Sequence, residues 1–174
     1  MLNDVYSALR SVLAKFEGQM RDFLFEDKGC TMIACFGINQ ITEVDIILLP
    51  EMFTTGFTMQ AKKFSEDMDG KTVNRMKLWA KKLNSAIGGS IIISEGSSVF
   101  NRFVFVTPDE SIFFYDKRHT FTLAGENKYY TKGNNLGIFE YKGWKICLRI
   151  CYDLRFPIWS RNKYNYDLLI YVAN

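Results

Sequence analysis

Three strand-like runs in this chain each end at a polar residue that can take part in catalysis. Short apolar runs bounded by turn signals are typical of strands buried in a sheet. The strand ends of a parallel or mixed sheet meet at one edge, so residues far apart in the sequence come together there. The three runs and the residues that follow them are 44–50 with Glu51, 111–116 with Lys117, and 144–150 with Cys151.

Cys151 lies where the strand-like run 144–150 gives way to a turn. We expect Pro157 to open a short helix here, because its missing N–H costs nothing in the first helical turn. A cysteine in such a turn is exposed at the edge of the sheet, near backbone N–H groups that favour the thiolate. Acyl-transfer enzymes often hold a nucleophile in this way. The alternative is a buried core cysteine, which is what we expect of Cys147.

The three positions lie in extended motifs. The motifs are Leu-Pro-Glu-Met-Phe-Thr-Thr-Gly-Phe at 49–57, Tyr-Asp-Lys-Arg-His at 115–119 and Cys-Tyr-Asp-Leu-Arg-Phe-Pro at 151–157. Together they resemble the nitrilase superfamily of carbon–nitrogen hydrolases, and within it the omega-amidase branch. The resemblance is clearest over residues 43–174. The triad of that superfamily is Glu, Lys and Cys in chain order, so the resemblance assigns these roles to Glu51, Lys117 and Cys151.

The resemblance implies both a fold and a mechanism. The fold is α/β, an α-β-β-α sandwich of two sheets packed face to face with helices outside. In the mechanism, Glu51 takes the thiol proton and later passes it to the leaving ammonia. Lys117 holds the thiolate and then donates to the oxyanion of the tetrahedral intermediate, together with the backbone N–H of Tyr152. Loss of ammonia leaves a thioester on Cys151, which water hydrolyses.

Three further residues are candidates for the site. Glu126 matches a second glutamate of the superfamily that contacts the lysine and helps to position substrate, although by itself it would be an exposed loop residue. Arg155 either meets a substrate carboxylate bidentately or forms a structural salt bridge with Asp153 or another acidic residue. Phe53, two residues after Glu51, is a candidate substrate contact.

The single histidine, His119, suggests cysteine–histidine chemistry as an alternative. It lies two residues after Lys117, where a side chain on the same side would compete with the lysine. A hydrogen-bonded structural histidine is therefore favoured. With one histidine and no Cys-x-x-Cys spacing, no metal centre is expected, and the implied mechanism needs no cofactor. The cysteines are Cys30, Cys35, Cys147 and Cys151.

Hydrophobic periodicity predicts the remaining elements. Apolar residues at three- and four-residue steps indicate a helix over 1–24 and another over about 70–86, with Asp69 as the N-cap of the second. We expect Gly88-Gly89 to end that second helix. The predicted strands are 90–95, 101–107 and 111–116, then a hairpin of 136–141 with 144–151, and a last strand at 167–173.

The length of 174 residues predicts one domain, a carbon–nitrogen hydrolase domain over 1–174. Superfamily members begin with a strand beside the glutamate strand and continue well past the last strand predicted here. This chain opens with a helical pattern and stops just after that strand. We therefore expect an incomplete sandwich, from a fragment, a truncated gene or a degraded relative.

Charge and hydropathy exclude several classes of partner. The net charge is +3, and basic residues cluster only in pairs such as Lys62-Lys63, so nucleic acid is not an expected partner. No apolar run approaches the length that spans a membrane. Residues 1–10 carry Asp4 and Arg10 and do not form a signal peptide, so we expect a cytoplasmic protein with reduced cysteines.

The function expected from these features is hydrolysis of a small amide, such as 2-oxoglutaramate, with water as the second substrate. The same chemistry on another amide, a nitrile or a carbamoyl-amine is one alternative. A catalytically inactive truncated relative that serves only as a structural or dimerisation partner is the other. Superfamily members pair through a helical surface near the nucleophile, so the resemblance implies a homodimer.

Overall fold

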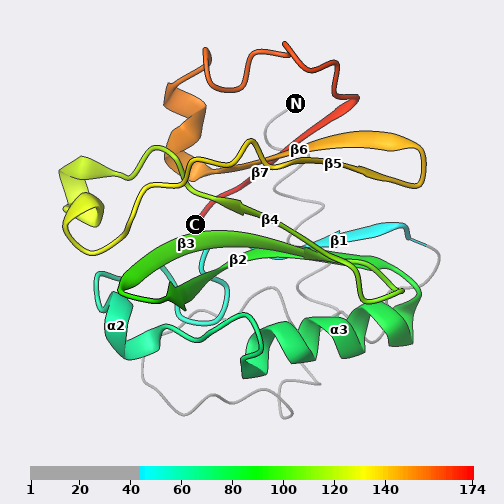
Figure 1. Cartoon of the computed structure of the whole chain (residues 1–174), viewed down its shortest axis with the longest axis horizontal. Helices are drawn as coiled ribbons and strands as arrows, with labels where there is room; N and C mark the ends of the chain where they lie inside the picture. The colour runs from blue at the N-terminus through cyan, green and yellow to red at the C-terminus, as the bar shows by residue number, and fades with distance from the viewer. Residues whose placement is uncertain (1–43) are drawn as a thin grey trace, which may run out of the picture.

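The computed structural model describes residues 44–174, so the helix predicted over 1–24 lies outside the described residues. In these residues the elements form layers (Figure 1). The helical elements are α2 (Ala61–Phe64), α3 (Lys71–Leu83) and the short 3₁₀ helices η3 (Thr122–Ala124), η4 (Glu126–Lys128) and η5 (Cys151–Arg155). The strands are β1 (Ile46–Leu48), β2 (Ala86–Glu95), β3 (Ser98–Val106), β4 (Ile112–Asp116), β5 (Ile138–Tyr141), β6 (Trp144–Ile150) and β7 (Leu168–Val172).

The strands form two sheets. The first has the order β1-β2-β3-β4, with β1 parallel to β2 and the other neighbours antiparallel. The second has the order β5-β6-β7, in which β6 is antiparallel to β5 and parallel to β7. Figure 1 shows α3 against one face of the four-stranded sheet and the three-stranded sheet over its other face. The α/β sandwich predicted from the sequence is therefore confirmed, with one helical layer among the described residues.

Strand β3 shows why the sheets stack in this way. Successive side chains of a strand point to opposite faces. Phe103 and Phe105 pack in the core between the two sheets, whereas Val104 and Val106 pack in the core beneath α3. All four side chains are fully buried, so β3 is covered on both faces. The continuous apolar run 103–106 follows from this double burial.

The helix α3 differs from its prediction at both ends. It begins after Gly70, whose N-cap position carries no side-chain hydrogen bond, so Asp69 is not the cap. The Glu66 carboxylate accepts from the Thr72 N–H at 2.9 Å instead. The helix ends at Asn84, which takes the left-handed conformation with φ 50°. Asparagine tolerates that conformation because its short side chain is compatible with it.

Gly88 and Gly89 were predicted to end the helix, but they lie inside β2. Packing explains their presence there. A Cβ on Gly88 would lie 3.0 Å from the side chains of Leu48 and Phe103, and a Cβ on Gly89 would lie 2.8 Å from Leu49. These glycines allow β1 to approach β2 closely, which fixes where the chain leaves β1.

Two other local predictions also change. The helix after β6 is η5, which begins at Cys151 and precedes Pro157, so the proline does not open it. Pro157 instead accepts from the Ser160 N–H in a following turn. The hairpin and the last strand are confirmed with shifted ends, at Ile138–Tyr141, Trp144–Ile150 and Leu168–Val172. Within residues 44–174, no helix has the length and apolar character needed to cross a membrane.

Candidate active site

Glu51 lies just past β1 and is 1% exposed. Its backbone N–H donates to the carbonyl of Ala173 at 3.3 Å, beyond the end of β7. The next N–H, of Met52, donates to the hydroxyl of Ser90 on β2 at 2.9 Å. Met52 has φ 47°, a left-handed conformation that turns the chain sharply after the glutamate. The Glu51 loop is thus tied to both sheets.

Lys117 lies just past β4 and is also 1% exposed. Its ammonium donates to Glu51 Oε1 at 2.8 Å and to Glu126 Oε1 and Oε2 at 3.1 and 3.0 Å. Burial disfavours the ammonium, but the negative charges of Glu51 and Glu126 outweigh burial and raise the pKa of Lys117. The lysine therefore stays charged between two carboxylates.

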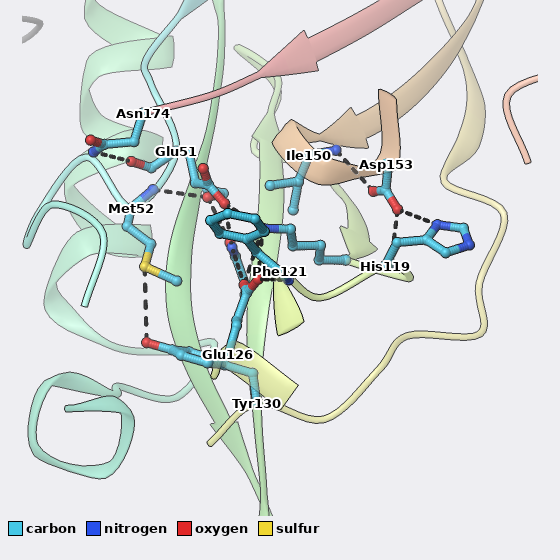
Figure 2. A network of polar contacts seen from close by, with 12 residues as sticks. Glu51, Met52, His119, Phe121, Glu126, Tyr130, Ile150, Asp153 and Asn174 are labelled. Carbon is cyan, nitrogen blue, oxygen red and sulfur yellow. Dashed lines mark hydrogen bonds and ion pairs between the residues drawn. The ribbon is translucent and has the colours of Figure 1, made fainter. Parts of the chain in front are cut away.

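Glu126 is the first residue of η4 and is fully buried. The alternative expectation, an exposed loop residue, is therefore wrong. Besides binding Lys117, its carboxylate accepts from the backbone N–H of Phe121. Its carbonyl accepts from the N–H of Tyr130 at 3.0 Å. Figure 2 shows the Glu51 and Glu126 side chains pointing toward one another, with the dashed contacts converging between them. The loop after β4 is folded back so that this glutamate faces the lysine.

Cys151 follows β6 and begins η5 with φ 42°. A non-glycine residue in this region is strained, which is typical of a nucleophile held in a tight turn. The side chain is half-buried. Burial and the negative charge of Glu51 raise the pKa of Cys151 to about 11. Lys117 opposes this shift but does not reverse it. The expectation that the turn favours a thiolate is therefore wrong.

Asp153 holds this turn in place. It is fully buried and accepts from the backbone N–H of Ile150 at 3.1 Å and from the hydroxyl of Tyr115 at 2.8 Å. It also accepts from the backbone N–H of His119 at 2.9 Å and contacts His119 Nδ1 at 2.8 Å (Figure 2). The His119 ring stacks on Phe156, with the ring centroids 3.9 Å apart. The structural role favoured for His119 agrees with these contacts.

The remaining predicted residues are less closely tied to the cluster. Tyr152 directly follows Cys151 in η5, and its ring lies 4.9 Å from that of Phe121. Arg155 is exposed, and among residues 44–174 the ion-pair partner of Asp153 is His119, so the salt bridge predicted between Arg155 and Asp153 is wrong. Phe53 is 7% exposed and packs in the core beneath α3. The structure thus does not bring Phe53 to the cluster.

Sequence reasoning missed a buried polar pair, Ser90 on β2 and Asn101 on β3. The two side chains are 0% and 1% exposed. The Asn101 amide donates to Glu51 Oε1 at 2.8 Å and to Glu126 Oε1 at 3.3 Å. A signal for them existed, because each is a polar residue within an apolar, doubly buried strand. Such residues need a buried partner.

Phe57 was also missed, and its ring lies 5.5 Å from the Lys117 ammonium. It is the second phenylalanine of the motif at 49–57.

The site as a whole combines a thiol, a neighbouring carboxylate and a charged ammonium. These are the parts of a nucleophile, a general base and an anion-stabilising group. Among residues 44–174, no group of His, Cys, Asp and Glu side chains is arranged to hold a metal ion.

Residues 31–173 match the family model described as "Carbon-nitrogen hydrolase". Among curated relatives, Omega-amidase YafV of Escherichia coli (strain K12) is 48% identical over 79% of this chain and 53% of its own length. The 2-oxoglutaramate amidase of Bacillus subtilis (strain 168) is 35% identical over 67% of this chain and 46% of its own length. The chain spans about half the length of the curated relatives that it matches.

Solved structures share the fold. XC1258 from Xanthomonas campestris, a CN-hydrolase superfamily protein with an arsenic adduct in its active site, superposes with a TM-score of 0.76. It is 39% identical, and the match covers 79% of this chain and 55% of that one. Nit3 of Saccharomyces cerevisiae, a nitrilase-superfamily member, superposes with a TM-score of 0.68 at 22% identity, over 79% of this chain and 54% of its own.

Proposed function

Because this chain belongs to the carbon–nitrogen hydrolase family, we propose that it hydrolyses a small non-peptide amide through a thioester on Cys151. The substrate class that we propose is the ω-amide of a 2-oxo dicarboxylate, with 2-oxoglutaramate as the representative. Relatives named omega-amidase and 2-oxoglutaramate amidase support this choice. We also propose that residues 1–174 belong to a single carbon–nitrogen hydrolase domain.

The observation that carries the proposal is the buried Lys117 ammonium between two carboxylates, one of which, Glu51, lies near enough to Cys151 to raise the pKa of its thiol. Lys117 binds both Glu51 and Glu126 at 3.1 Å or less. The raised pKa keeps the thiol protonated at neutral pH, so attack on an amide requires a base at the moment of reaction. Glu51 is the carboxylate with the largest effect on the pKa of the thiol, so we assign that role to Glu51.

The reaction then proceeds in two halves. Glu51 takes the thiol proton as the sulfur of Cys151 attacks the amide carbon, forming a C–S bond and an oxyanion. Lys117 and the backbone N–H of Tyr152 stabilise that oxyanion. Glu51 returns the proton to the leaving nitrogen, the C–N bond breaks, and ammonia departs from a thioester. Water, deprotonated by Glu51, attacks the thioester and releases the carboxylic acid and the thiol.

Glu126 has a different role in this scheme. Its carboxylate is occupied by Lys117 and by the N–H of Phe121. It therefore keeps the lysine charged and directed toward the reacting carbon. Arg155, exposed on η5, is a candidate partner for the distal carboxylate of the substrate.

Ammonia release from 2-oxoglutaramate by the purified protein tests the proposal, with glutamine and a simple nitrile as comparison substrates. Cys151→Ala should abolish release, and Cys151→Ser should reduce it at least about 1,000-fold, because an alcohol is a far weaker nucleophile without a strong base. Trapping of an acyl adduct on the peptide that contains Cys151 would establish the thioester. Equal ammonia release by Cys151→Ala and the wild type would refute the mechanism.

We also propose that the chain forms a homodimer through the surface around η5 and acts in the cytoplasm. Leu154 and Ile158 are 65% and 74% exposed beside the cysteine turn. Exposed apolar side chains that cluster on one surface are typical of protein interfaces. Sedimentation of the wild type as a monomer at micromolar concentration would argue against the dimer, and cell fractionation tests the location.

A further inference from the structure

Asn101 occupies an unusual place for an amide side chain. It lies on β3, an inner strand of the four-stranded sheet, and is 1% exposed. Its amide donates to Glu51 Oε1 at 2.8 Å and to Glu126 Oε1 at 3.3 Å. Its carbonyl oxygen accepts from the hydroxyl of Ser90 at 2.8 Å. Every polar atom of this side chain is therefore used inside the protein.

The direction of these hydrogen bonds is fixed by the backbone. The N–H of Met52 can only donate, so the Ser90 hydroxyl accepts from it at 2.9 Å. That hydroxyl then has its own hydrogen to donate, and it donates to Asn101. The amide of Asn101 must consequently face Ser90 with its oxygen and the two carboxylates with its NH₂ group. The loop that carries Glu51 thus orients the amide that binds Glu51.

The two carboxylate oxygens of Glu51 consequently differ in their hydrogen-bond donors. The Lys117 ammonium and the Asn101 amide both donate to Oε1, each at 2.8 Å. Two donors on one oxygen stabilise its charge and prevent the carboxylate from rotating. The negative charge of the same carboxylate raises the pKa of the Cys151 thiol. The oxygen without these two donors, Oε2, is the more basic of the two.

We propose that Asn101 is a positioning residue that, with Ser90, anchors Oε1 of Glu51 so that Oε2 receives the proton of Cys151. The inference rests on the proposed function, since it specifies how the base of that reaction is held. A neutral donor suits this position. Two carboxylates already face one ammonium, and a third carboxylate would add repulsion, whereas an amide binds both without changing the charge.

Carbon-13 NMR of the carboxyl groups tests the anchoring without any need for turnover. In protein labelled with ¹³C-glutamate, the Glu51 signal is the one that disappears in Glu51→Gln. Asn101→Leu should move the titration midpoint of this signal upward by about one pH unit, because the charged carboxylate loses a donor. Ser90→Ala should move it in the same direction by less, since the amide of Asn101 is no longer oriented. Asn74→Leu, which removes an amide from the exposed face of α3, should leave the midpoint in place.

The kinetic test uses the same variants. Asn101→Leu should lower kcat/KM for the amide about 10- to 100-fold, mainly through kcat, and should move the acidic limb of its pH profile upward. Asn74→Leu should keep the wild-type profile. If the wild type hydrolyses none of the amides tested, the proposed function fails, but the NMR result still decides the role of Asn101. An unchanged Glu51 midpoint in Ser90→Ala and in a folded Asn101→Leu would overturn the inference. If Asn101→Leu does not fold, Ser90→Ala alone decides.

Discussion

Lys117 carries its charge in a place where burial alone would remove it. The side chain is 1% exposed, and the carboxylates of Glu51 and Glu126 restore its charge by raising its pKa. The ion group also has net negative charge, one ammonium against two carboxylates. That excess, together with burial, is what raises the pKa of the neighbouring Cys151 thiol to about 11. A protonated thiol reacts more slowly with oxidants than a thiolate does.

The charge of Lys117 should be visible in the stability of the protein. Lys117→Met leaves two buried carboxylates without their cation and should lower the free energy of unfolding by about 3–5 kcal/mol at pH 7. The folded pKa of this lysine is raised, so its stabilisation is fully present below the unfolded value of about 10.4. It is lost only as the pH rises through the folded pKa. Denaturant unfolding at pH 7, 9 and 11 should therefore give equal differences at the first two values and a smaller one at the third.

Lys81→Met is the matched control for this measurement. Lys81 pairs with Glu110 at 3.5 Å, and the two side chains are 72% and 50% exposed. Exposed ion pairs contribute little, so this variant should change the free energy of unfolding by less than about 0.5 kcal/mol. A Lys117→Met variant as stable as Lys81→Met would contradict the proposed ion group.

The raised pKa of Cys151 predicts slow alkylation at neutral pH. The rate with iodoacetamide should rise about tenfold per pH unit between pH 7 and 10, since thiolate remains the minor form there. Trypsin separates Cys147 and Cys151 into peptides 146–149 and 150–155, so mass spectrometry can follow Cys151 alone. Glu51→Gln removes a charge that raises this pKa and should make alkylation faster at each pH. A rate for the wild type that levels off below pH 9 would contradict the prediction.

At the scale of elements, the cysteine turn depends on a carboxylate two residues further along. Asp153 joins the end of β6 to the segment after β4 through Ile150, Tyr115 and His119. Asp153→Ala leaves these buried donors without an acceptor and should lower the free energy of unfolding by about 2–4 kcal/mol. Chemical denaturation measures this change. Glu110→Ala removes an exposed carboxylate and should change it by less than about 0.5 kcal/mol.

How much of this was predictable depends on the range of the interactions. The strands that lead to Glu51, Lys117 and Cys151 were predictable, because consecutive apolar residues indicate a buried strand. The three motifs were also predictable, because each consists of neighbouring residues in the sequence. The networks around Asn101 and Asp153 were not, since their partners lie on other strands. A polar residue in an apolar run indicates that some partner exists, but the chain does not say which one.

The glycine pair Gly88-Gly89 shows that the sequence alone also leaves the backbone role of a residue undecided. The pair Gly88-Gly89 follows a helical pattern, where glycine commonly ends a helix. The structure uses the pair for close approach of β1 to β2, where Leu48 and Leu49 occupy the space of a side chain. Asn84 ends the helix instead. Sequence alone allows both uses, and only the packing of one strand on the next decides between them.

At the scale of the described residues 44–174 as a whole, the two sheets pack against each other around a shared apolar core. Phe105 is fully buried in the core between them, with its ring 4.9 Å from Phe139 and 5.7 Å from Tyr141. Phe105→Ala should lower the free energy of unfolding by about 3–5 kcal/mol and weaken contact between the sheets. Leu78→Ala, at a position 61% exposed on α3, should change it by less than about 0.5 kcal/mol. Equal effects of the two variants in denaturant unfolding would exclude this packing.

The hydrogen bonds between the Glu51 loop and the end of β7 carry a consequence for synthesis of the protein. Asn174 donates to the carbonyl of Glu51 across 123 residues of sequence, and the Glu51 N–H reaches Ala173. A ribosome adds about 5–20 residues per second, so several seconds separate the two ends of this contact. Until β7 has emerged and docked beside β6, the glutamate loop lacks these anchors. During synthesis, Cys151 therefore leaves the ribosome before the Glu51 loop can form these two hydrogen bonds.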